Sequence, residues 1–246
     1  MNYYESPFKY SGQTIEYLPP SGSPCELTDL HQKILTILKS YGDQSRHRIE
    51  EEYAREYGTV PNIKPYLSGL SDAGLIRTYT FTGGSMRYYS PYPRVYDGKT
   101  KGFHIPYREE DSVLDILKHM AFHQFYRLWQ QACPYSPISE EFFVSIHGAH
   151  GTLSMEGRFT LILNETTVSF YVFVLRRGED LASILHKLSA YTKGTSNVHP
   201  LIVCEDRRHM EALYTPECLF TYDTLCDPER FLVKMSGEET YYYGGI

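Results

Sequence analysis

The hydrophobic pattern changes its period along the chain, and this change limits the folds that the chain can adopt. Between residues 27 and 73, apolar residues recur at the three- and four-residue spacing of amphipathic helices. Gly42, Gly58 and Pro61 divide this stretch into predicted helices at 27–42, 44–57 and 61–73. Their predicted inward residues are Leu30, Ile34, Ile37, Leu38, Ile49, Tyr53, Tyr57, Ile63, Leu67 and Leu70. The segments IRTYTF and MRYYS then alternate around a Gly-Gly turn, which predicts a β-hairpin.

Three short helices followed by a hairpin resemble a winged helix-turn-helix domain. The run LSDAGLIR, which leads from the third helix into a strand, strengthens the resemblance over residues 25–95. Residues 1–24 end in YLPPSGSP and are predicted to be an N-terminal arm and linker. Residues 96–111 are predicted to be a second linker, 112–235 a second domain, and 236–246 a mobile tail.

The second domain alternates helices and strands in an order that predicts a mixed sheet. We expect a helix at 112–131, strands at 141–147, 157–163 and 167–175, a helix at 180–193, a strand at 200–204, a helix at 206–214 and a strand at 218–223. Helices that connect successive strands imply some parallel pairing. The predicted fold class is therefore mixed α+β and α/β, with an N-terminal winged helix and a C-terminal α/β domain.

The α-β-β-β-α-β order of the second domain resembles the core of restriction-endonuclease-like proteins. With GRFTLILNETTVSFYVFVLRR, LASILHKLSAYTK and PLIVCEDRRHMEALY, the chain resembles the replication-relaxation proteins of bacterial mobile elements, which join a winged helix to such a domain. A nuclease of this fold uses an acid on its second strand and a (D/E)xK on its third to bind Mg²⁺. Glu156 stands just before the predicted second strand, but SFYVFVL has neither acid nor lysine. The resemblance thus implies a non-catalytic accessory protein of a plasmid or conjugative element, without catalytic residues.

The winged-helix resemblance implies that double-stranded DNA is the partner. The third predicted helix offers Asn62, Lys64 and Ser68 to a major groove, although Asp72 opposes them. Arg77 and Arg87 of the hairpin and Arg46 and Arg48 of the second helix are predicted to contact phosphates. Glu50–Glu52 would repel the DNA backbone unless they point away from it.

The charge distribution leaves a second interpretation open, in which the chain is an adaptor or inhibitor that binds a protein. Nine basic and eight acidic residues lie in 25–95, whereas twelve basic and nineteen acidic residues lie in 104–246. An acidic C-terminal domain suits a basic protein partner, and the same domain could support a homodimer. The 23 tyrosines are typical of contact surfaces, although a biased composition of the source genome explains them equally well.

Other kinds of chemistry have little support in the sequence. His119 and His123 share a helix face and His147 and His150 form HGAH, but we interpret them as ordinary histidines and predict no metal site. The five scattered cysteines predict neither a disulfide framework nor a Cys–His pair, and the short glycine segments predict no nucleotide cofactor. Without a signal peptide or a run of roughly 18 apolar residues, the expected location is the cytoplasm, with no membrane partner.

Overall fold

A computed structural model of the chain is mixed α+β and divides into two compact units. It describes residues 10, 12–91, 113–132, 137–149, 151–163, 165–193, 195, 197–213, 215, 218–222, 231–233 and 241–243. One unit contains the described residues from Tyr10 to Met120, and the other contains those from Ala121 onward. The boundary falls inside a helix, whereas the linker predicted at 96–111 lies outside the described residues.

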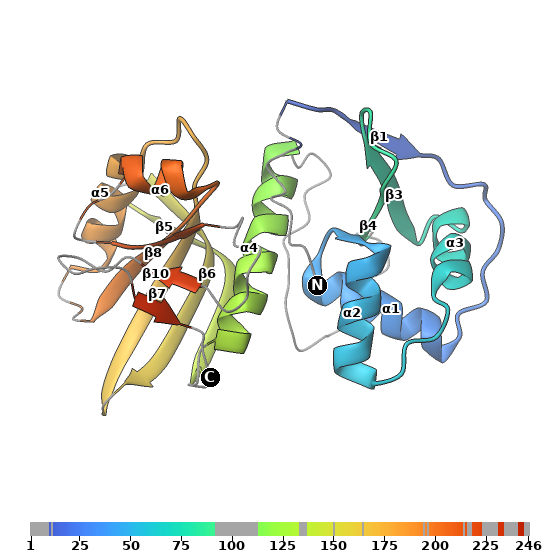
Figure 1. Cartoon of the computed structure of the whole chain (residues 1–246), viewed down its shortest axis with the longest axis horizontal. Coiled ribbons are helices and arrows are strands. Elements are labelled where there is room, and N and C mark those ends of the chain that lie inside the picture. Colours follow the sequence, from blue (N-terminus) through green and yellow to red (C-terminus); the bar gives the residue numbers. More distant parts are fainter. Residues whose placement is uncertain are drawn as a thin grey trace. The chain divides into compact units, whose positions relative to one another are not determined.

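The first unit combines three complete helices, and the start of the helix that crosses the unit boundary, with a four-stranded antiparallel sheet (Figure 1). Its elements are β1 (Ile15–Leu18), α1 (Asp29–Tyr41), β2 (Gln44–Ser45), α2 (Arg46–Tyr57), α3 (Lys64–Asp72), β3 (Ile76–Phe81) and β4 (Arg87–Pro91). The strand order is β1-β3-β4-β2, so the short strand between α1 and α2 pairs with the second strand of the hairpin. The segment predicted as an arm thus contributes an edge strand, β1, which pairs with β3.

Helix boundaries in this unit follow from local hydrogen bonds. Ser45 caps α2 by accepting the Arg48 N–H, and Gly58 ends the helix with a φ of 86°. The third helix begins at Lys64 rather than at Pro61, and Asn62 Oδ1 accepts the Lys64 N–H at 3.3 Å just ahead of it. The predicted helix faces are largely confirmed, since Ile34, Ile37, Leu38, Ile49, Tyr53, Ile63, Leu67 and Leu70 form one buried core. Tyr57 is the exception, with 40% of its surface exposed.

The second unit is built on a five-stranded mixed sheet. Its elements are the C-terminal part of α4 (Val113–Ala132), β5 (Ser139–Gly148), β6 (Gly151–Leu163), β7 (Thr166–Val174), α5 (Leu181–Tyr191), β8 (Val198–Cys204), α6 (Arg207–Leu213) and β9 (Leu219–Tyr222). The strands follow chain order, with β5, β6 and β7 antiparallel and β7, β8 and β9 parallel. A small ladder pairs β10 (Phe231–Val233) with β11 (Tyr241–Tyr243), so part of the predicted tail is a strand.

Helices cover both faces of this sheet (Figure 1). On one face, Phe122, Tyr126 and Trp129 of α4 stack against Phe159, and Trp129 also meets Phe170. Gly157 makes this approach possible, because a Cβ there would lie 2.7 Å from Phe122 Cζ. On the other face, residues of α5 and α6 pack with the sheet in a second buried cluster: Leu153, Met155, Phe173, Leu181, Leu188, Ile202 and Met210.

The regular pairing of β5 with β6 is interrupted at one point, and Glu156 lies there. Phe143 of β5 has a φ of 50°, and the regular register omits the Phe143–Glu156 pair. Beyond this point Met155 packs with the α5 cluster, whereas Gly157 faces α4. Glu156 Oε2 accepts the Val174 N–H of β7 at 2.9 Å. The predicted position of Glu156, ahead of the second strand, is therefore wrong, because β6 begins five residues earlier, at Gly151.

Candidate functional site

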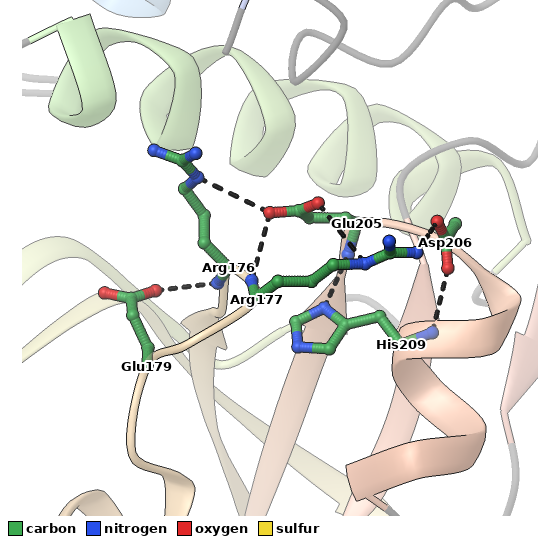
Figure 2. Close-up of polar contacts among 6 residues, drawn as sticks. All are labelled: Arg176, Arg177, Glu179, Glu205, Asp206 and His209. Atoms are coloured by element: carbon green, nitrogen blue, oxygen red, sulfur yellow. Dashed lines mark hydrogen bonds and ion pairs between the residues drawn. The ribbon is translucent and has the colours of Figure 1, made fainter. Parts of the chain in front are cut away.

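Two surfaces concentrate the polar chemistry of the described residues, one in each unit. The first, here called the strand-end cluster, lies where the parallel strands β7 and β8 end. It consists of Arg176, Arg177, Glu179, Glu205, Asp206 and His209 (Figure 2). In open α/β sheets, ligands bind at the carboxyl ends of the parallel strands, so this edge is the first place to look for a site.

Glu205 organises the strand-end cluster. Its Oε1 accepts the Arg177 backbone N–H at 3.0 Å and lies 3.4 Å from Arg176 Nε, as Figure 2 shows. Its Oε2 lies 3.8 Å from Arg177 Nε. Arg177 also pairs with Asp206. One carboxylate that follows β8 thereby holds the loop that follows β7.

The flanking residues fix the two loops themselves. Glu179 accepts the Arg176 N–H at 2.7 Å, which closes the turn before α5. Asp206 accepts the His209 N–H at 2.8 Å at the start of α6, and His209 Nδ1 accepts the Glu205 N–H at 3.3 Å. Burial lowers the pKa of His209, so the imidazole is neutral at pH 7 and its proton lies on Nε2.

This geometry suits a contact surface more than a reaction centre. The carboxylates of the cluster accept backbone N–H groups or pair with arginines, which orients the guanidinium groups. Arg177 is the most accessible of its ion-paired side chains, at 56% exposed. Among the residues that the structure describes, no three His, Cys, Asp or Glu side chains gather closely enough to hold a metal ion.

The sequence prediction did not include the strand-end cluster. The signal that could have revealed it is the pair of charged runs, RRGED and EDRRH, that directly follow the buried strands at 167–175 and 200–204. Parallel pairing of those strands brings the two runs to one edge of the sheet.

The second surface contains the residues predicted to contact DNA, and the structure separates them. Lys64 and Ser68 are exposed on α3, and the Ser68 hydroxyl donates to Asp72 at 3.3 Å. Arg87 is exposed at the start of β4, opposite Thr80. Because side chains alternate along a strand, Arg87 shares the sheet face of Tyr89, which packs in the helical core.

Arg77 points to the other face of the same hairpin. It is three residues from Thr80, so it shares a face with Tyr79 rather than with Arg87. Its guanidinium lies over the Tyr17 ring of β1, 5.6 Å from the ring centroid. The two arginines predicted to act together therefore lie on opposite faces of the sheet.

Glutamates engage the two predicted arginines of α2. Arg46 Nε lies 3.5 Å from Glu50, and Arg48 Nη1 lies 3.0 Å from Glu51. Two of the three glutamates expected to repel DNA thus pair with the cations expected to attract it, which reduces the positive charge of this face, whereas the buried Glu52 pairs with Arg55.

Histidines and cysteines fall in several places. His123 is buried in α4, and His147 Nδ1 lies 3.0 Å from Thr152 Oγ1 in the β5–β6 hairpin. His150 lies outside the described residues. Cys25 Sγ lies 3.5 Å from His31 Nε2, a contact that the sequence spacing did not predict. The thiols of Cys204 and Cys218 are buried.

In the described part of the chain, no helix is long and apolar enough to cross a membrane. No protein-family model matches the chain, and no curated protein matches it. Among solved structures, the crystal structure of protein VC1899 from Vibrio cholerae is similar, with a TM-score of 0.31 and 10% sequence identity. The alignment covers 92% of this chain and 59% of that one, so the chain spans less than two thirds of its length. This likeness assigns neither a family nor a function.

Proposed function

We propose that the Tyr10–Met120 unit is a winged-helix domain that binds double-stranded DNA. The second unit is then a restriction-endonuclease-like domain that serves as a non-catalytic platform for a protein partner or a second copy. The order α1-β2-α2-α3-β3-β4, with β2 paired to β4, supports the first assignment. The order α4-β5-β6-β7-α5-β8 supports the second. A role in plasmid replication or mobilisation stays a prediction of the family resemblance.

The observation that carries this proposal is the placement of Lys64 and Arg87. Both are exposed, and within the described residues neither forms an ion pair. Lys64 is the first residue of α3, and the N-terminal residues of a recognition helix are those that reach bases and phosphates. Arg87 lies on the face of the hairpin that packs toward the helices. The proposed interface therefore contains Asn62, Lys64, Ser68 and Arg87, without Arg77.

The buried third strand supports a non-catalytic second unit. Val172, Phe173 and Val174 of β7 are at most 2% exposed, and they occupy the strand where a nuclease of this fold places its acid and lysine. The carboxylate of Glu156 accepts a backbone N–H of that strand instead of facing a second acid there.

Fluorescence anisotropy with a random DNA duplex tests the proposal, at about 50 and about 200 mM salt. We expect affinity to fall steeply with salt. In Lys64→Gln/Arg87→Gln, the slope of log K against log salt should decrease by about 2, since each phosphate contact contributes about 0.9. Arg77→Gln is the matched control for the single variant Arg87→Gln, because each removes one guanidinium charge but from opposite sheet faces, and Arg77→Gln should leave the slope unchanged.

Two results would count against this interface. An equal effect of Arg77→Gln would mean that net charge, rather than the α3 side of the unit, determines binding. A lack of binding at low salt would favour the adaptor interpretation. The pairing of the α2 arginines with glutamates also favours that interpretation, because it reduces the positive charge available to DNA. The search would then turn to protein partners of the acidic second unit.

A further inference from the structure

Cys25 and His31 form a thiol–imidazole pair that the proposed DNA interface does not use. Cys25 precedes α1 and is partly buried, whereas His31 lies in the first turn of α1 and is only 8% exposed. The His31 Nε2 atom lies 3.5 Å from Cys25 Sγ. Residue 25 is therefore partly open to solvent, while a buried ring is directed at its sulfur from the protein side.

The surroundings of His31 determine which of its nitrogens carries the proton. The Thr28 backbone N–H points at Nδ1 from 3.1 Å, and an N–H can only donate. Nδ1 is thus an acceptor, and burial lowers the pKa of His31, which keeps the ring neutral at pH 7. The ring proton accordingly lies on Nε2, where it donates toward the sulfur. Tyr66 holds the ring edge-on, with 4.9 Å between the ring centroids.

The segment that carries Cys25 lies along α3 as a strap, defined here as residues 20–25. The Gly22 N–H donates to the Asp72 carbonyl at 2.8 Å, and Pro20 packs beside Gly74. Gly69 has no side chain and so leaves room for the thiol, since a Cβ there would lie 3.4 Å from Cys25 Sγ. These contacts fix the sulfur in front of the His31 ring.

We propose that Cys25 is a modification site that forms a mixed disulfide with low-molecular-weight disulfides of the glutathione class. The thiolate is the reactive form of a cysteine, and the Nε2–H of His31 is placed to donate to the Cys25 sulfur. After the thiol loses its proton to solvent, the sulfur attacks one sulfur of the disulfide and a new S–S bond forms. The original S–S bond breaks, and the other half leaves as a thiolate that takes a proton from water.

The test follows the modification of each cysteine in the reduced full chain at pH 7. The chain is incubated with excess oxidised glutathione, quenched in acid and mapped by peptide mass spectrometry. Cys25 should react well before the buried thiols Cys204 and Cys218, which serve as internal references. His31→Gln preserves an acceptor for the Thr28 N–H, as in a capping box, but removes the ring N–H.

We expect His31→Gln to slow the reaction of Cys25 at least about threefold, because it removes the ring N–H that faces the sulfur. His186→Gln removes an exposed histidine on α5 and should leave the rate unchanged. Unaltered reactivity in a folded His31→Gln protein would overturn the proposal. If that variant does not fold, the rate at which wild-type Cys25 reacts in the folded protein is compared with its rate in denaturing urea. A slower reaction in the folded protein would overturn the proposal equally.

Discussion

Replacing Gly157 by alanine should destabilise the packing of α4 on the five-stranded sheet. The added Cβ would lie 2.7 Å from Phe122 Cζ and 3.0 Å from Phe159 Cζ, and both rings are fully buried. Neither ring can simply swing away, because Phe122 also stacks on Tyr126, and Phe159 on Trp129. Overpacking of this kind costs about 1–3 kcal/mol. Alanine recovers at most about 1 kcal/mol by restricting the unfolded chain, so we expect a net loss of about 1–2 kcal/mol.

The chain reports this change through its single tryptophan. Trp129 lies in the affected layer, so its fluorescence follows unfolding at the site of the substitution. In equilibrium urea unfolding, the midpoint should fall while the slope stays the same. Phe122→Leu in the Gly157→Ala background should restore part of the loss, because it removes the atoms that clash. An unchanged or higher midpoint for Gly157→Ala alone would refute the packing described here.

Three further predictions concern single side chains. Gly69→Ala in α3 should stabilise the chain by up to about 1 kcal/mol, since alanine favours helix and its Cβ meets nothing closer than 3.4 Å; a lower thermal midpoint by circular dichroism would contradict this. Glu205→Gln should cost about 1–2 kcal/mol in urea unfolding, because Arg176 and Arg177 lose their shared carboxylate; equal stability would show that solvent replaces it. Burial lowers the pKa of His119 from 6.5 to about 4, so its contribution is complete above pH 6.5 and is lost as the pH falls through 4. Wild type should lose roughly 2–3 kcal/mol more than His119→Gln between pH 7 and pH 4, and parallel pH profiles would rule this out.

Local patterns in the sequence predicted much of the first unit. The helical period identified Ile34, Ile49 and Leu67 as core residues because each helix buries one face against its neighbours. The Gly-Gly turn likewise located the hairpin. These features depend on residues close together in the chain, so the sequence contains the information directly.

Features that depend on strand pairing were not predictable in this way. Arg77 and Arg87 lie on opposite faces because of the hairpin register, which composition does not reveal. The strand-end cluster forms because β8 pairs in parallel with β7 and brings Glu205 to Arg177. Cys25 meets His31 because the strap turns back onto the first turn of α1. In each case tertiary geometry joins residues whose spacing has no periodic signature.

The strand orders of the four-stranded and five-stranded sheets imply that the two sheets form in different ways during synthesis. In the five-stranded sheet every strand pairs with the next one in the chain, starting from the tight Gly148–Gly151 hairpin. Such a sheet can grow by one strand at a time as the chain leaves the ribosome, because each strand needs only the strand before it. By contrast, β1 emerges first in the other unit but must wait for β3, because Ile15 pairs with Phe81. Until then, the edge strand has no sheet to join, and the strap that carries Cys25 has no α3 to lie along.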